Sequence, residues 1–496
     1  MLKINIQSKL LSGTIKVTSP KDDKLTIEKI KDLCNSGKFC PPYVTCIHFI
    51  NNDNWIFATD QVRSIPIFFS INDNCLNISI DTNTIATVEN KTINRDEFIC
   101  CGYTTGNTTL IDGVFQLQAG EYLWFNKEKI EVGFYSRYLT NDFFSHDFYC
   151  LKLNLKDTFN VVFKTLVENI NNRTALIPLS GGYDSRLIAY WLHRLNYKNV
   201  ICFTYGRKGN IEIENARQTA KILNFKWIFI DYTQLLIKEY LNDGIFKDYY
   251  QYMSNNSSMF YMQDYFSVKY LKEMSLIPED SVFIPGHSGD FLGGSHLYPA
   301  LGSKMSGNQL AEEIFFKHYK FVITSRSEKI ILIQKIKNNI EANYPSHLIY
   351  EDWDLRERQS KFIVNSARVY SYFGFDYLLP FWDKRLIMFF KQVPFEFKLY
   401  KRLYDNSIIE LFEPLNLNFK SELQPSIKEI TIQNLKQLLL KKFPYLRKLK
   451  GLPKNDPYCY FEITSVMKED LIKRGISFKE VNNYNGIIVQ WYLNHS

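Results

Sequence analysis

The sequence predicts an α/β protein in which a doubly wound parallel sheet follows a β-rich domain. A chain of 496 residues is too long for one ordinary hydrophobic core. Short apolar runs separated by turns fill its first part, whereas strand and helix patterns alternate from about residue 150 onward. We therefore expect two domains, spanning residues 1–145 and 150–496.

The first domain has the spacing of a β layer or sandwich, because apolar runs recur at short intervals. The expected strands are 43–49, 55–59, 65–70, 76–80, 120–125 and 130–134.

The second domain begins with a strand–helix–strand–helix–strand pattern, at 175–179, 185–196, 200–205, 212–224 and 227–231. In the first helix Leu187, Trp191 and Leu195 fall on one face. Alternating strands and helices build a parallel sheet whose ligands bind at the carboxyl ends of the strands.

The most informative stretch is the loop between the first strand and helix, Ser180-Gly181-Gly182-Tyr183-Asp184-Ser185. Its glycines allow close backbone approach at a helix N-terminus, where N–H groups attract anions, and its serines add hydroxyl donors. Asp184 would repel a phosphate unless Mg²⁺ lay between them. The Gly-Lys-Ser/Thr ending of a Walker A loop is missing.

This loop resembles the pyrophosphate-binding loop of the ATP pyrophosphatase (PP-loop) superfamily, and in particular of the asparagine synthetase family, whose members split ATP into AMP and pyrophosphate. The resemblance implies an ATP site with adenine against the backbone of two strand ends. The implied ATP-binding residues are Leu179, Ser180, Gly181, Gly182, Asp184, Ser185, Thr204, Gly206 and Gly286. Without the family resemblance, residues 204–206 would be read as an ordinary turn.

A second glycine-rich turn, Gly286-His287-Ser288-Gly289-Asp290, follows the apolar run 281–285. It is similar to the family's Gly-(Glu or His)-Gly-x-Asp-Glu segment, which implies that Asp290 joins Asp184 in holding Mg²⁺. Phe291 replaces the family's Glu, and the following glycine pair comes one residue early. The same string nearly spells a Gly-x-Ser-x-Gly nucleophile elbow, which leaves a serine hydrolase open.

Three candidate catalytic residues lie further along the chain. Asp376 begins a segment similar to the family's Glu-x-Arg-x-Pro-Phe-Leu-Asp, with Leu378 in place of the Arg. Lys398 and Lys420 fall near the family's Lys-x-x-Leu-Arg and Arg-x-Lys segments, which implies that a lysine stabilises the adenylation chemistry. Before them, 353–375 is expected to be one long helix whose charged residues, such as Arg356 and Lys361, are solvated.

The segment Asp60 to Phe69 resembles part of the family's glutaminase domain, an N-terminal-nucleophile domain. The family's nucleophile is a cysteine exposed by removal of Met1, with its own amine as base. Here position 2 is Leu, the first cysteine is Cys34, and Ile65 replaces the family's Arg. We therefore expect no glutaminase activity.

Composition limits the remaining classes. A net charge of +8 is modest for this length, so nucleic acid is not an expected partner. No apolar run reaches the length of a membrane span and no signal peptide is recognisable, so we expect a cytoplasmic protein. The nine cysteines lack zinc spacing.

The sequence thus predicts an enzyme that uses ATP and Mg²⁺ to adenylate a carboxylate and passes it to ammonia or an amine, forming an amide. The family resemblance includes enzymes of uronic acid amidation in surface polysaccharides, the substrate class we favour. Asparagine synthesis from free ammonia or with a separate glutaminase stays open, as does an inactive scaffold.

Overall fold

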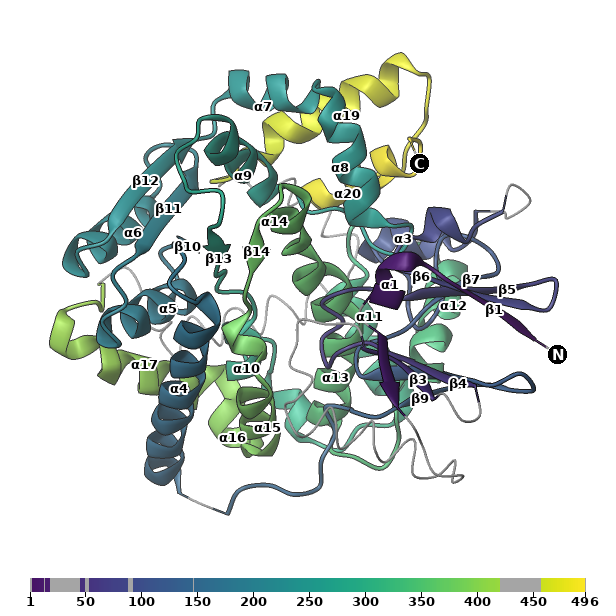
Figure 1. Ribbon diagram of the computed structural model, residues 1–496, viewed down its shortest axis with the longest axis horizontal. Helices are drawn as coiled ribbons and strands as arrows, with labels where there is room; N and C mark the ends of the chain where they lie inside the picture. The colour runs from purple at the N-terminus through teal and green to yellow at the C-terminus, as the bar shows by residue number, and fades with distance from the viewer. Residues whose placement is uncertain are drawn as a thin grey trace.

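The computed structural model describes residues 2–12, 14–17, 45–49, 53–87, 92–145, 147–419 and 456–495. Figure 1 shows a parallel sheet enclosed by helices at one end of the molecule and a β-sandwich at the other.

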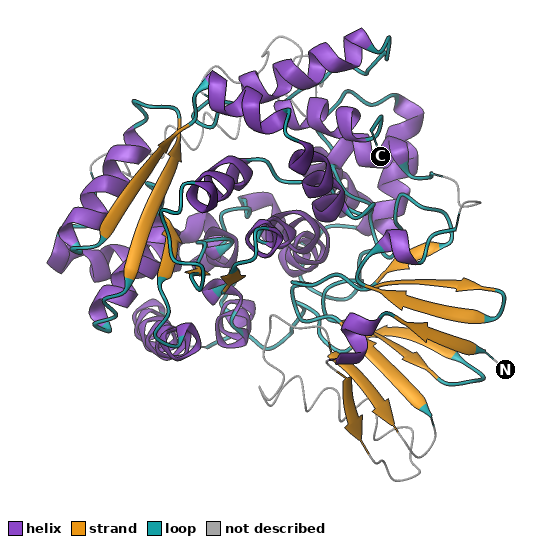
Figure 2. Cartoon of the chain, turned by 45° about the horizontal axis from the view of Figure 1, so that its top comes forward, coloured by secondary structure: helices purple, strands orange, loops and turns teal. Residues whose placement is uncertain are grey.

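The N-terminal part is a sandwich of two sheets, in the order β1-β6-β5-β7 and β2-β3-β4-β8-β9 (Figure 2). The strands are β1 (Lys3–Ile6), β2 (Thr14–Val17), β3 (Thr45–Phe49), β4 (Asn54–Ala58), β5 (Phe68–Asn72), β6 (Cys75–Ser79), β7 (Val114–Gln116), β8 (Glu121–Phe125) and β9 (Ile130–Phe134). All six expected strands are present. Both sheets contribute to one apolar core, which includes Phe57, Leu76 and Leu123.

The sheet that follows the sandwich in the chain contains five parallel strands in the order β12-β11-β10-β13-β14. They are β10 (Ala175–Pro178), β11 (Val200–Gly206), β12 (Lys226–Asp231), β13 (Val282–Phe283) and β14 (Asp376–Tyr377). The chain moves outward from β10 to β12 and then crosses to the other side of β10. This order confirms a doubly wound sheet and places its switch point between β10 and β13, where such sheets bind ligands.

Helices cover both faces of this sheet because its side chains alternate. Ala175 and Ile177 of β10 point into one core and Leu176 into the other. The first core includes α4 (Phe148–Ile170), α5 (Tyr183–Arg194), α6 (Ile211–Ile222), α15 (Lys384–Gln392) and α17 (Arg402–Phe412). The second includes α7 (Gln234–Leu241), α8 (Gly244–Ser254), α9 (Gln263–Glu273), α14 (Arg368–Tyr372), α19 (Tyr460–Lys473) and α20 (Tyr484–Tyr492).

The remaining helices connect these layers or join them to the sandwich. They are α1 (Ser8–Ser12), α3 (Arg95–Cys101), α10 (Gly289–Gly293), α11 (Gly307–His318), α12 (Arg326–Asn338), α13 (Ser346–Asp354) and α16 (Phe395–Lys398). α3 belongs to the N-terminal part of the chain, yet its Phe98 packs against Tyr492 of α20, with ring centroids 5.8 Å apart. The two expected domains therefore share a core.

The expected helix at 353–375 is present but not uniform: α13 runs into a π-helix, Leu355–Val364, and then α14. The expectation that its charged residues are solvated is wrong. Lys361 is fully buried, pairs with Glu357 at 2.6 Å and donates to the carbonyl oxygens of Thr104 and Gly106. Arg356 donates to Gln118 at 2.6 Å. These cations are buried because the sandwich packs against this helix.

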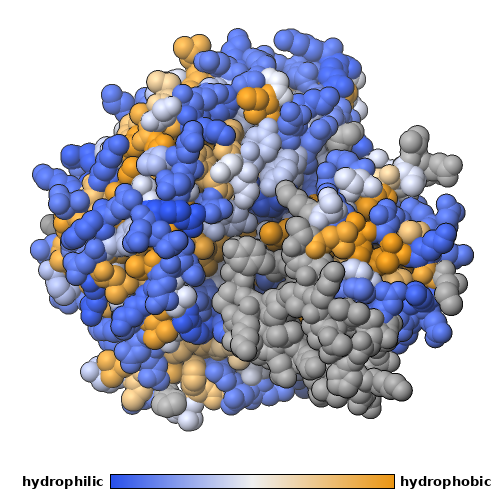
Figure 3. Space-filling view, viewed as in Figure 1, coloured by the Kyte–Doolittle hydropathy of each residue, from blue (hydrophilic) through white to orange (hydrophobic). Residues whose placement is uncertain are grey.

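The described residues include no helix long and apolar enough to cross a bilayer. On the face shown in Figure 3, hydrophobic residues are scattered among hydrophilic ones.

Candidate functional site

The predicted phosphate-binding loop lies at the switch point, between the end of β10 and the N-terminus of α5. Close approach requires glycine at position 181 but not at position 182, where φ is an ordinary −77° and an added Cβ would lie 3.4 Å from Ser180 Oγ. A Cβ on Gly181 would lie 2.9 Å from the Cα of Glu212, and one on Gly286 would lie 2.8 Å from the amide nitrogen of Ser185. The loop after β13 therefore packs directly on the loop after β10.

Two serine hydroxyls hold this loop in shape. The amide of Ser180 donates to Ser185 Oγ at 3.0 Å, and the amide of Gly182 donates to Ser180 Oγ at 3.2 Å. The backbone thus turns the free N-terminus of α5 toward the switch point, a position suited to binding an anion.

The predicted acidic pair meets at this point. Asp184 accepts hydrogen bonds from the amide of Asp290 and from the hydroxyl of Tyr404, both at 2.8 Å. Asp290 accepts from Ser295 at 2.9 Å. Burial, with a smaller contribution from the negative charge of Asp290, raises the pKa of Asp184 to about 7, although Lys401 opposes the shift. The two carboxylates therefore lack full charge compensation.

This acidic pair fits a divalent cation. The described residues contain no group of three or more His, Cys, Asp or Glu side chains that could hold a metal by themselves. Mg²⁺ commonly takes one or two carboxylates and completes its shell with phosphate and water, so Asp184 and Asp290 would suffice beside a bound nucleotide.

A lysine that was not singled out from the sequence lies beside this pair. Lys401 forms an ion pair with Asp405 at 3.0 Å, and the charges of Asp405, Asp184 and Asp290 together outweigh burial and raise its pKa. Both Tyr400 and Lys401 have a φ of +58°, an uncommon conformation for residues other than glycine. The signal in the sequence was a second lysine three positions after Lys398.

Lys398 is fully buried and forms an ion pair with Glu351. It also donates to the hydroxyl of Tyr138 at 3.3 Å. Burial would raise the pKa of Glu351, but Lys398 and His296 lower it to about 2. Lys398 therefore neutralises an internal carboxylate instead of facing the loop at 180–185.

The remaining predicted ATP-binding residues, at the ends of β10 and β11, make contacts with other parts of the protein. Thr204 is at the correct strand end, but its hydroxyl donates to the carbonyl oxygen of Leu179 at 2.7 Å and accepts from Trp227 at 2.9 Å. Gly206 has φ +128°, and a Cβ added to it would lie 2.6 Å from the carbonyl oxygen of Pro457. Leu179 continues β10, its amide donating to Phe203.

Of the two remaining catalytic candidates, Asp376 is not brought to this edge. Asp376 pairs in register with Val282, which is itself in register with Ala175, so it lies at the start of its strand, away from the loops. Its side chain is 72% exposed and contacts Arg173. Lys420 lies outside the described residues.

The backbone of Ser288 has a φ of +71°, the strained conformation that a nucleophile elbow would require. The side-chain contacts do not support the hydrolase alternative. The Ser288 hydroxyl donates to Gln359 at 2.9 Å, and Nδ1 of the neighbouring His287 has no partner among the described residues. Burial lowers the pKa of His287 to about 4.

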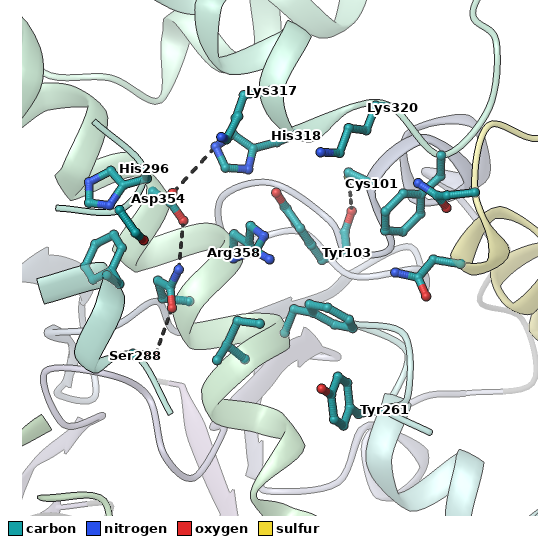
Figure 4. A pocket seen from close by; sticks show the side chains of 18 of the residues that line it. Cys101, Tyr103, Tyr261, Ser288, His296, Lys317, His318, Lys320, Asp354 and Arg358 are labelled. Atoms are coloured by element: carbon teal, nitrogen blue, oxygen red, sulfur yellow. Dashed lines mark hydrogen bonds and ion pairs between the residues drawn. The ribbon is translucent and has the colours of Figure 1, made fainter. Parts of the chain in front are cut away.

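A cavity of about 610 Å³ opens next to the acidic pair. Ser288, Asp290, Ser295 and His296 line the end nearest the switch point (Figure 4). Lys317, Lys320 and Arg358 also line the cavity, as do Tyr103, Tyr261, Tyr460 and Tyr484. The cavity thus has walls from the sandwich side, the π-helix and the C-terminal helices.

Residues 174–257 match the family model described as "Queuosine biosynthesis protein QueC". The matched segment contains β10, the loop at 180–185, β11 and β12. This match supports, at the level of the superfamily, the predicted resemblance of the loop to ATP pyrophosphatases. The match covers well under half of the chain and does not by itself assign the whole chain to a family.

Among solved structures, the ammonia-dependent NAD synthetase of Campylobacter jejuni matches at 14% identity, over 39% of this chain and 95% of that chain, with a TM-score of 0.21. That TM-score is too low to support an argument about fold or function. A search of curated proteins found no match.

Proposed function

We propose that the protein is an ATP-dependent ligase that adenylates a carboxylate, releasing pyrophosphate, and transfers the acyl group from AMP to ammonia or an amine. The observation that carries this proposal is the meeting of Asp184 and Asp290 at a glycine-rich loop on the switch point of a parallel sheet, beside a cavity large enough for a second substrate. A kinase-type loop would instead need a lysine where this loop has Asp184.

The residues of the chain have distinct roles in this reaction. Negative charge grows on the departing pyrophosphate, and the N-terminus of α5 with the serine-braced loop would receive it. Lys401 supplies a positive charge close to both carboxylates. Mg²⁺ held by Asp184 and Asp290 would add charge neutralisation on the phosphates.

The cavity would hold the carboxylate substrate, which supplies the acyl group. The carboxylate to be activated would enter from the end lined by Ser288 and His296, which adjoins Asp290. Attack by an amine on the acyl adenylate forms the amide and releases AMP. Water must be kept out during this step, because it would hydrolyse the adenylate. The expected asparagine synthetase relationship, a separate glutaminase and a uronic acid substrate remain parts of this proposal.

The test is ATP–pyrophosphate exchange with a panel of carboxylic acids that includes uronic acids and aspartate. Exchange should require both Mg²⁺ and one class of acid. Asp290→Asn should lose it, whereas Asp376→Asn, at the opposite edge of the sheet, should keep it. Failure of the protein to bind ATP with Mg²⁺ would refute the proposal, and exchange that survives Asp290→Asn would refute the role of the acidic pair.

A further inference from the structure

The cavity beside the acidic pair carries more positive than negative charge. Three cations line it, Lys317, Lys320 and Arg358, against two acids, Asp290 and Asp354. His318 adds no charge at neutral pH, because burial holds its pKa far below the usual value.

Two of these cations have no direct partner among the described residues. Lys317 of α11 and Arg358 of the π-helix make no hydrogen bond or ion pair with any residue in the part of the chain that the structure describes. Burial lowers the pKa of Lys317, and Asp354 opposes this shift. Asp354, the acid between them, accepts a hydrogen bond from Gln359 at 3.4 Å and lies 3.6 Å from His318.

The helical spacing brings Arg358 to the cavity. Residues four apart lie on one face of a helix, and Arg358 and Phe362 of the π-helix line the cavity together with Asp354, which immediately precedes it. Glu357 and Lys361 share the opposite face, which contacts the sandwich. π-Helical turns are frequent at functional sites. Figure 4 shows Lys317 and Arg358 approaching the cavity from separate elements.

We propose that the acid activated by this enzyme is polyanionic: one carboxylate reacts at the Asp290 end, and a second anionic group binds between Lys317 and Arg358. The assignment of the reacting carboxylate rests on the proposed ligase function. The volume of about 610 Å³ is in the range of pockets for drug-sized ligands, and Tyr261 and Phe362 in the wall suit a ring-sized body. A substrate of this kind is larger than a single amino acid such as aspartate.

The test uses probes that differ in charge on one scaffold: glucuronic acid, glucaric acid and glucuronic acid 1-phosphate, with aspartate for comparison. Their dissociation constants for the full chain are measured by titration calorimetry. The two polyanions should bind at least tenfold more tightly than glucuronic acid, a difference of about 1.4 kcal/mol that one hydrogen bond between charged groups can supply. Equal affinities, no binding by any of the three, or tighter binding of aspartate would overturn the proposal.

Variants locate the second anionic site. Arg358→Gln and Lys317→Gln should each abolish the preference for polyanions, and Arg358→Lys should retain part of it. Lys304→Gln, which removes an exposed lysine outside the cavity lining, is the matched control and should change nothing. ATP binding in the same variants should be unchanged. If the parent protein itself does not bind ATP, the result counts against the ligase function and not against this anion site.

Discussion

Asp184→Asn should stabilise the ligand-free protein at alkaline pH while removing its activity. The carboxyl group has an ordinary pKa of 3.8 that rises to about 7 in the folded protein, mainly through burial and then through Asp290. Between these two values the unfolded chain ionises and the folded chain does not. Folding therefore loses stability as pH rises from about 4 to 7 and stays constant above that.

The magnitude follows from the size of the window. Each pH unit inside it lowers the free energy of unfolding by at most about 1.4 kcal/mol, so the step from pH 5 to pH 7 amounts to at most roughly 3 kcal/mol. Since Asp184 is only partly buried and Lys401 lies nearby, we expect about 1–2 kcal/mol. Asparagine cannot ionise, so the variant lacks this loss.

The assay is urea unfolding of both proteins at pH 5, 6, 7 and 8 without nucleotide. Comparing the change with pH cancels the fixed cost of replacing one acceptor of the hydrogen bonds from Tyr404 and Asp290. The stability difference between variant and parent should move in favour of the variant up to pH 7 and then level off. Millimolar Mg²⁺ with ATP should reduce this trend in the parent alone. A difference that does not change with pH would refute the assigned charge imbalance.

Four further outcomes are expected. Lys401→Met should lower the rate of ATP–pyrophosphate exchange by 10²-fold or more, because it removes the cation nearest the acidic pair, and an effect below threefold would exclude that role. Gly181→Ala should weaken ATP binding in calorimetry, since its methyl group would lie 2.9 Å from the Cα of Glu212 and must displace the loop; unchanged affinity would mean that the loop does not bind phosphate. Lys361→Met should destabilise the protein in urea unfolding by about 3–5 kcal/mol, because it leaves Glu357 buried without its partner, and a loss below 1 kcal/mol would contradict that account. Purified protein should release no glutamate from glutamine above the no-enzyme control, because position 2 is Leu; release would show a nucleophile of another kind.

Local patterns in the sequence were sufficient to predict the sheets and the loop. The alternation of apolar and polar residues in the sandwich and the switch to helical spacing after 180–185 depend on neighbours along the chain, and both are present in the structure. In the sandwich β1, β2 and β7 were missed, because strands of three or four residues are too short to show a period.

Contacts between distant segments could not be predicted in this way. Lys361 has the appearance of a solvated helical lysine until the carbonyl oxygens of Thr104 and Gly106 are brought to it from the other half of the chain. Asp376 was expected near the reacting group from its place in a segment, but register put it at the wrong end of β14. Conversely, Lys401 reaches the acidic pair through a backbone conformation that the sequence does not signal.

The π-helix also links the N-terminal part of the chain to the cavity. One side of this helix delivers Arg358 to the cavity, and the other is held by the turn at 104–106, which covers the charges of Glu357 and Lys361. A chain cut to residues 150–496 would open that buried pair to solvent and release the wall that bears Arg358. The N-terminal part of the chain thus supports one wall of the cavity, and the two halves would have to be expressed and engineered as one unit.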